Sequence, residues 1–189
     1  VTVQDVTNEA GQSLGFRHAD GVLTVDGVSP DGERIRIRYR GSPTRGLYFT
    51  GPTAFAPDRP PMAWTQCQDQ DGHHLFPCHD HPGQRCPVRL RITVPEGNEV
   101  VANGALLGRS SEDGWVTWTW EEAQSIPAYL VVVAVGPMVI LETTADNAGS
   151  SLPVRYLAPA GADLGVMKRV FARTPAMISA FAERFGVPY

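Results

Sequence analysis

The residues best suited to chemistry gather in one short stretch of the chain, between positions 64 and 82. Four of the five histidines and two of the three cysteines lie in it: His73, His74, His79, His81, Cys67 and Cys78. Histidine and cysteine are natural ligands of zinc. A small metal-binding β domain is therefore one hypothesis for this chain.

The spacing of these residues disfavours a metal site. Adjacent side chains such as His73 and His74 diverge in most backbone conformations, and the cysteines form no short-spaced pair. A nucleophilic Cys67 or Cys78 would need a histidine beside it in space, which the sequence does not establish. We interpret the histidines as polar loop residues with Asp80 as a local hydrogen-bond partner, and we expect no metal ligand and no catalytic residue here.

The rest of the chain, which must position this stretch, is predicted to be mostly β. Apolar residues alternate with arginine or threonine over Arg34–Arg40 and Pro87–Val94, as in strands with one wet face. Residues Trp115–Trp120 alternate similarly and carry aromatics on both faces. Dipeptides typical of turns separate the runs: Asp31-Gly32, Gly97-Asn98 and Asp113-Gly114. This spacing predicts an antiparallel sandwich or a large curved sheet.

Further strands are expected later in the chain. Tyr129–Val135 is a continuous apolar run, typical of a strand covered on both faces. Met138–Thr143 is expected to pair with it after a turn at Gly136-Pro137. Residues 148–151 have the composition of a linker, and one more strand is expected over Val154–Leu157.

The last part of the chain is predicted to be helical. Apolar residues recur at helical spacing from Leu164 to Phe171 and again from Met177 to Phe185. Thr174-Pro175 is typical of a helix start, although the proline could instead kink one longer helix. Gly186 is typical of a helix end.

Composition narrows the function classes. The net charge is -4, apolar residues make up 42%, and charged residues 19%, so we expect a folded domain that does not bind nucleic acid. The longest apolar run is too short to span a bilayer, and we expect no membrane association. An odd number of cysteines favours a reducing, cytoplasmic location. The first residue, Val1, and the ending at Tyr189 suggest that both ends are cut.

An ordered set of short motifs resembles one enzyme family. The motifs are Gly46-Leu47-Tyr48-Phe49, Thr65-Gln66-Cys67-Gln68, Phe76-Pro77-Cys78-His79-Asp80-His81-Pro82, Asn103-Gly104 and Ile126-Pro127-Ala128-Tyr129-Leu130. Together they resemble the N-terminal β domain of the zinc aminopeptidase family of aminopeptidase N and leukotriene hydrolase. The ending at Phe185–Tyr189 resembles the first helix of that family's catalytic domain.

The resemblance implies a fold and an activity. It implies a saddle-like, mainly antiparallel β domain over residues 1–150. Residues 151–189 would then begin a thermolysin-like catalytic domain and include its first helix. The family's zinc motif, His-Glu-X-X-His, and its Gly-X-Met-Glu-Asn motif do not occur in this sequence. The parent protein is therefore expected to be a zinc aminopeptidase, whereas these residues alone should bind no zinc and be inactive.

Two glutamines are the site residues that the resemblance implies. In the family, a Gln-X-Glu or Gln-X-Gln pair faces the zinc cleft and helps hold the free α-amine of a peptide. Gln66 and Gln68 occupy these positions, and amide oxygens accept hydrogen bonds from an ammonium group. The expected partners are peptides with a free N-terminus. One departure is that Gly72-His73 stand where the family usually has Ala-Arg, an arginine expected to support the loop.

Two other expectations complete the hypothesis. An apolar surface around the helix Phe171–Phe185 would remain exposed without the rest of a catalytic domain, so these residues alone are expected to self-associate. The alternative to an aminopeptidase domain is a non-catalytic interaction or scaffold relative of the family. The sequence beyond Tyr189 distinguishes the two, since only an active enzyme requires both missing motifs.

Overall fold

The computed structural model describes residues 1–28 and 32–189, so Asp31 of the expected Asp31-Gly32 turn lies outside the described residues. The chain divides into two compact units. Unit 1 comprises Val1–Phe49, Ala63–Val94 and Val100–Ala134, and unit 2 comprises Thr50–Met62, Pro95–Glu99 and Val135–Tyr189.

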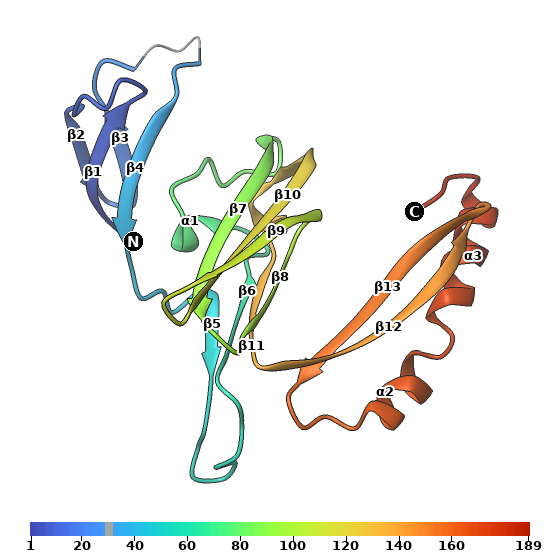
Figure 1. The fold of residues 1–189 in the computed structure, drawn as a ribbon. Coiled ribbons are helices and arrows are strands. Elements are labelled where there is room, and N and C mark those ends of the chain that lie inside the picture. Colours follow the sequence, from blue (N-terminus) through green and yellow to red (C-terminus); the bar gives the residue numbers. More distant parts are fainter. Residues whose placement is uncertain (29–31) are drawn as a thin grey trace. The chain divides into compact units, whose positions relative to one another are not determined.

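Strands are the main secondary structure of the chain, as Figure 1 shows. The first eleven strands are β1 (Thr2–Asn8), β2 (Phe16–Ala19), β3 (Val22–Val25), β4 (Ile35–Arg40), β5 (Gly46–Thr50), β6 (Met62–Gln66), β7 (Arg85–Pro95), β8 (Glu99–Ala102), β9 (Ala105–Glu112), β10 (Trp115–Pro127) and β11 (Val133–Gly136). They build sheets in the orders β1-β4, β2-β3, β7-β10-β9 and β5-β6-β11-β8. The pairs β1–β4, β2–β3 and β9–β10 are antiparallel. A mainly antiparallel β fold is thus confirmed.

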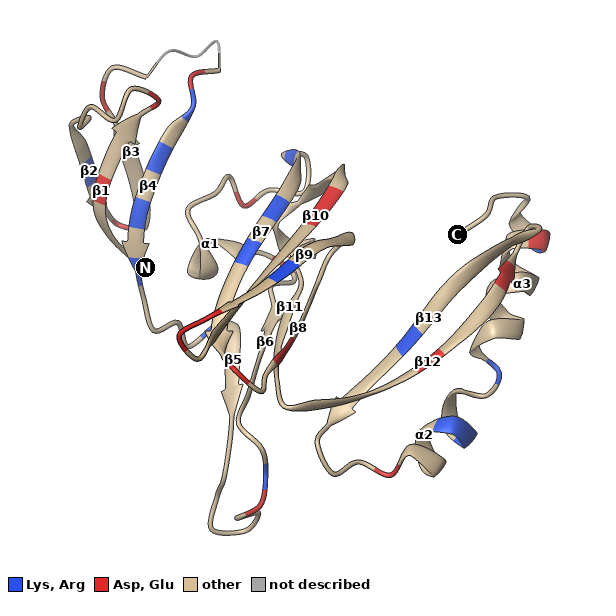
Figure 2. Cartoon of the chain, in the orientation of Figure 1, with Lys and Arg blue, Asp and Glu red and all other residues tan. Residues whose placement is uncertain are grey.

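The alternating patterns form strands as predicted. Along β7 the alternating apolar residues from Val88 to Val94 are wholly or partly buried, whereas the arginines are exposed. The arginines of β4 are exposed as well, and the basic residues of both strands stand out in Figure 2. In β10, Trp118 and Trp120 are buried on one face, while Trp115 is exposed. One face of each strand therefore packs inward and the other meets solvent.

The apolar run Tyr129–Val135 is only partly a strand, which corrects the prediction. A 3-10 helix, η1 (Ala128–Leu130), includes its first two residues, and β11 begins only at Val133. The side chain of Asn103 provides the physical reason. Its amide nitrogen donates to the carbonyl of Leu130 at 3.0 Å, and its amide oxygen accepts from the backbone nitrogen of Val132. These backbone groups are therefore bonded to a side chain rather than to a neighbouring strand.

The strand that follows also pairs differently from the prediction. β12 (Met138–Asn147) pairs antiparallel with β13 (Ser150–Pro159) and not with the preceding apolar run. Ala148 and Gly149, expected in a linker, form the tight turn of this hairpin, and both have positive φ angles, 53° and 86°. A two-residue turn with both residues in that region matches the twist of a hairpin. The local pairing of β12 with β13 therefore replaces the expected pairing.

Two helices follow the hairpin in unit 2, and both contact β12. Helix α2 (Leu164–Phe171) begins at Asp163, whose carboxylate accepts from the backbone nitrogens of Gly165 and Val166 at 2.7 and 3.2 Å. Helix α3 (Thr174–Phe185) has Pro175 in its first turn and ends at Gly186, as the sequence predicts. The proline begins a separate helix rather than kinking one long helix. None of the helices in the described part of the chain has the length and apolar character that crossing a membrane requires.

Candidate functional site

The two glutamines lie at the end of β6, on a segment whose neighbours hold it in place. Gln66 and Gln68 are exposed. Thr65, which precedes them, and Cys67, which lies between them, are buried. The hydroxyl of Thr65 donates to the carbonyl of Val131 at 3.1 Å and accepts from the backbone nitrogen of Val133 at 2.9 Å. One buried side chain thus ties the strand that ends in Gln66 to the chain entering β11.

A second set of contacts holds the backbone just after the glutamines. The carbonyl of Cys67 accepts from the backbone nitrogen of Asp71 at 2.8 Å, and its thiol donates to the carbonyl of Gly46 at 3.5 Å. The carboxylate of Asp71 pairs with the guanidinium of Arg45 at 2.9 Å. Gly46 has a φ of 78°, and a Cβ there would collide with the carbonyl of Asp71. The Gly46 and Gln66–Gln68 motifs are therefore parts of one packed arrangement.

The motif Phe76–Pro82 follows a short helix, α1 (Gly72–Leu75), and contacts its first turn through Asp80. The side chain of Asp71 makes no capping bond to it. Asp80 caps the helix instead: its carboxylate oxygen Oδ2 accepts from the backbone nitrogen of His73 at 3.1 Å and contacts the Nδ1 of the same residue at 2.8 Å. Asp80 is thus the local hydrogen-bond partner that the sequence suggested, and its histidine is His73.

The remaining histidines and cysteines are poorly placed for chemistry. The ring of His74 lies 4.1 Å from that of His73, and burial, followed by the charge of His73, lowers the pKa of His74. Burial raises the pKa of the Cys78 thiol to about 12, and Asp80 adds to this effect. Burial also raises the pKa of Cys67. Both shifts favour the protonated thiol, whereas nucleophilic attack requires the thiolate.

Zinc does not fit the described residues of this chain. Among them, no group of three or more histidine, cysteine, aspartate or glutamate side chains could hold a metal ion. Asp80 is already bonded to His73. This arrangement argues against the small metal-binding domain, and no chemical step of this chain is assigned to a metal.

The site also contains residues that sequence reasoning missed. Arg45 and Asp71 form the ion pair beside Cys67, although neither was singled out from the sequence. The only available signal was their position next to residues of the motifs, Gly46 and Gly72. His81 makes a local contact: its ring accepts from the backbone nitrogen of Gly83 at 3.0 Å.

Comparison with known proteins identifies the family. A model of the peptidase M1 N-terminal domain matches residues 9–130. The chain belongs to this family. The matched part of the M1 domain contains β2 to β10 and the whole loop from Gln66 to Pro82. The resemblance given by the ordered motifs is thereby confirmed.

Curated relatives of this M1 domain are aminopeptidases. Aminopeptidase B of Rattus norvegicus is 25% identical over 153 residues, which cover 81% of this chain and 20% of the relative. Leucine aminopeptidase 2 of Aspergillus fumigatus is 29% identical over 115 residues, which cover 54% of this chain and 18% of the relative. The chain thus spans about a fifth of the length of these curated relatives.

Solved structures share the fold. An M1 zinc metallopeptidase from Deinococcus radiodurans matches 98% of this chain and 43% of its own, with a TM-score of 0.77 at 20% identity. A mutant of that protein bound to a Tyr-Ser-Ala substrate has a TM-score of 0.76 at 19% identity. The M1 zinc metallopeptidase therefore shares the fold of almost this whole chain, and the match is not confined to residues 9–130.

Proposed function

We propose that this chain is the substrate-side domain of a zinc-dependent aminopeptidase, which removes N-terminal residues from peptides. Residues 1–150 would form the β domain and residues 151–189 the start of the catalytic domain. The observation that carries the proposal is the pair of exposed amides, Gln66 and Gln68, on a backbone anchored by buried neighbours. Membership of the peptidase M1 N-terminal domain family supports it.

The chemistry proposed for the two glutamines is recognition of a peptide's free amine. Each amide oxygen can accept a hydrogen bond from an ammonium group, and each amide nitrogen can donate to a peptide carbonyl. Neither side chain carries a charge, so the pair would orient the N-terminus without an ion pair. The zinc and the groups that activate water would be held by a part of the parent protein outside these residues.

Kinetics of the full-length parent protein test this role. Gln68→Ala should lower kcat/KM for aminoacyl p-nitroanilides by the equivalent of about 1–3 kcal/mol, the value of a hydrogen bond to a charged group. Gln70→Ala is the matched control, because Gln70 is also an exposed glutamine of the same turn. Unchanged kinetics for Gln68→Ala would remove this residue from the site.

The alternative, a non-catalytic scaffold relative, predicts a different parent protein. An enzyme requires His-Glu-X-X-His and Gly-X-Met-Glu-Asn in the sequence following Tyr189, whereas a scaffold can lack them. Sequencing the parent gene and assaying the purified product for release of N-terminal residues separate the two. A parent with both motifs and no peptidase activity at saturating zinc would count against the enzyme.

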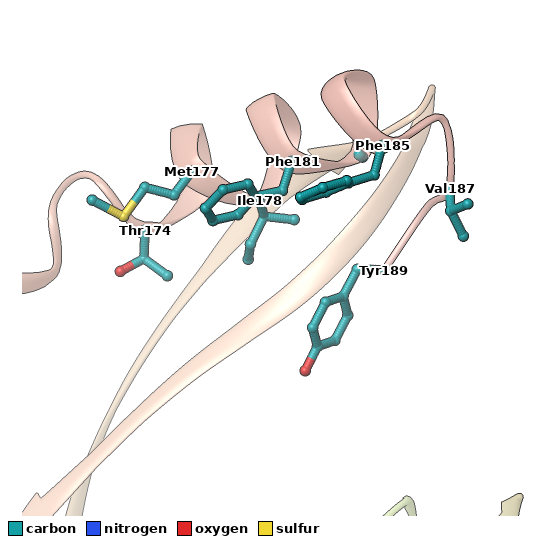
Figure 3. Close-up of a pocket in the computed structure, with 8 residues that line it drawn as sticks. Thr174, Met177, Ile178, Phe181, Phe185, Val187 and Tyr189 are labelled. Carbon is teal, nitrogen blue, oxygen red and sulfur yellow. The ribbon is translucent and has the colours of Figure 1, made fainter.

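We also propose that the isolated 189 residues self-associate through α3. A pocket of about 470 Å³ lies along this helix, and Figure 3 shows its apolar lining. Met177, Phe181 and Phe185 are 52%, 60% and 72% exposed, which is unusual for three large apolar residues on one helix. Sedimentation velocity over a concentration series should show dimers or larger species for these residues alone. Phe181→Asp should shift the distribution to monomer, whereas a monomer at all concentrations contradicts this idea.

A cytoplasmic location remains part of the proposal. The described cysteines, Cys67, Cys78 and Cys86, are all free thiols, which is consistent with a reducing compartment. Labelling of the free thiols in protein taken directly from cells tests this, because disulfide-bonded cysteines would not react.

A further inference from the structure

Helix α1 depends on a side chain from outside its own segment. The four-residue helix begins after Asp71, which makes no side-chain bond to its first turn. Short helices leave their first backbone nitrogens unpaired, and they need such a cap to persist. Asp80, which lies seven residues beyond His73, supplies it by accepting from the backbone nitrogen of His73 at 3.1 Å.

The imidazole of His73 makes this cap a clasp with two contacts. Its Nδ1 lies 2.8 Å from the same carboxylate oxygen of Asp80 that accepts the backbone bond. The side chain of Asp80 is only 8% exposed, so few water molecules can replace a lost donor. A Cβ on Gly72 would lie 3.2 Å from the other carboxylate oxygen, so Asp80 fits closely against the helix. Loss of the imidazole would therefore leave a nearly buried carboxylate with one donor fewer.

The clasp is linked to the glutamine segment through the backbone. Asp71, the residue before α1, donates its backbone nitrogen to the carbonyl of Cys67 at 2.8 Å. Cys67 stands between Gln66 and Gln68, and within the described residues neither glutamine side chain makes a hydrogen bond of its own to the protein. The orientation of Gln68 is thus set by the backbone on either side of it, and α1 fixes the following side.

We propose that His73 is a positioning residue for substrate binding, acting through Asp80 and α1 on the backbone that carries Gln68. This inference rests on the proposed function, because Gln68 must contact substrate for the clasp to matter. The side chain of His73 is 44% exposed, which leaves room for a longer residue at this position. An arginine can also hold the carboxylate, with two donors in parallel.

Four variants of the full-length parent protein test the inference with aminoacyl p-nitroanilides. His73→Ala should raise KM about fivefold to tenfold, with kcat changed less than about twofold, as expected for loss of one hydrogen bond that orients a binding group. His73→Arg should restore KM to within about twofold of the wild type. His79→Ala is the matched control, since it removes an exposed histidine of the same loop and should change neither constant. The fourth variant is the double variant His73→Ala/Gln68→Ala.

The double variant decides whether the effect passes through Gln68. If it does, removing His73 should change KM no further once Gln68 is absent, whereas independent effects would multiply. An unchanged KM in His73→Ala, or no recovery in His73→Arg, overturns the inference while leaving Gln68 in the site. Unchanged kinetics in Gln68→Ala instead remove Gln68 from the site, and the inference that rests on this residue then fails with it. A variant that melts earlier but keeps its KM shows that His73 is only structural, which also overturns the inference.

Discussion

The hydroxyl of Thr65 offers a sharp test of how the glutamine segment is held. Thr65→Val preserves the shape of the side chain and removes both hydrogen bonds, to the carbonyl of Val131 and from the backbone nitrogen of Val133. Each bond contributes about 1 kcal/mol, and the orphaned carbonyl of Val131 costs about 1 kcal/mol more. Val131 is only 2% exposed, so water does not replace the lost donor.

A gain in apolar burial offsets part of this loss. Burying a methyl group in place of the hydroxyl stabilises the folded state by less than about 1 kcal/mol. The free energy of local opening around β11 should therefore fall by about 2 kcal/mol, and its amides should exchange about 30-fold faster. Hydrogen–deuterium exchange of the intact protein, read on peptides spanning Val131–Gly136, measures this change.

A matched substitution isolates the effect of burial. Thr93→Val removes a hydroxyl that pairs at 2.9 Å with the hydroxyl of Thr117, but Thr93 is exposed. Water can replace that bond, so the amide exchange rates of β7, the strand that contains Thr93, should change less than about threefold. Thr65→Ser, which keeps the hydroxyl, should protect β11 much better than Thr65→Val. Equal exchange rates at β11 in the wild type and Thr65→Val would refute the reasoning.

Two more predictions follow from backbone geometry and thiol ionisation. Gly104→Ala should abolish soluble expression or lower Tm sharply, because φ is 78° and the new Cβ would collide with the carbonyl of Glu121. Gly97→Ala, at a φ of 88° in open space, should cost only about 1–2 kcal/mol in a thermal melt, and equal losses would contradict the collision. In the folded protein at pH 8, iodoacetamide should label exposed Cys86 well before Cys78, whose pKa is raised to about 12. Mass spectrometry gives the order, and raising the pH should speed labelling of Cys78 up to that pKa.

Regular patterns explain why much of the fold could be predicted. The alternation along β4, β7 and β10 requires only a sheet with one covered face, so sequence period alone identifies these strands. Gly186 likewise ends α3, because its φ of 68° suits glycine. Local chemistry was sufficient in these places.

The errors arose where a distant or polar contact decides the structure. The run from Tyr129 is apolar enough for a strand, but the side chain of Asn103 bonds the backbone groups at Leu130 and Val132. Met138–Thr143 has strand character whichever partner it takes, and the turn at Ala148-Gly149 selects β13. The spacing of apolar residues in the sequence indicates neither the hydrogen bonds of Asn103 nor the strand that β12 pairs with.

The candidate site was only partly accessible for the same reason. Asp80 could be named as a hydrogen-bond partner because it is close in sequence to several histidines. That His73 is the partner depends on the turn of α1. This turn brings both the backbone nitrogen and the ring of His73 to the Oδ2 of Asp80. The pairing of Arg45 with Asp71 joins segments 26 positions apart, and no sequence pattern indicates it. The role of Gln66 and Gln68 came from the family resemblance and stays a prediction.

The contacts of Thr65 also imply an order of events during folding. They join residues 66 and 68 positions apart, whereas the clasp between His73 and Asp80 spans only seven. Contacts between near neighbours close quickly, and those between distant residues must wait for a large loop to be ordered. On a ribosome, α1 and its clasp can therefore assemble first. The strand bearing Gln66 gains its anchor only after β11 has been made, which places completion of this surface late in the folding of unit 1.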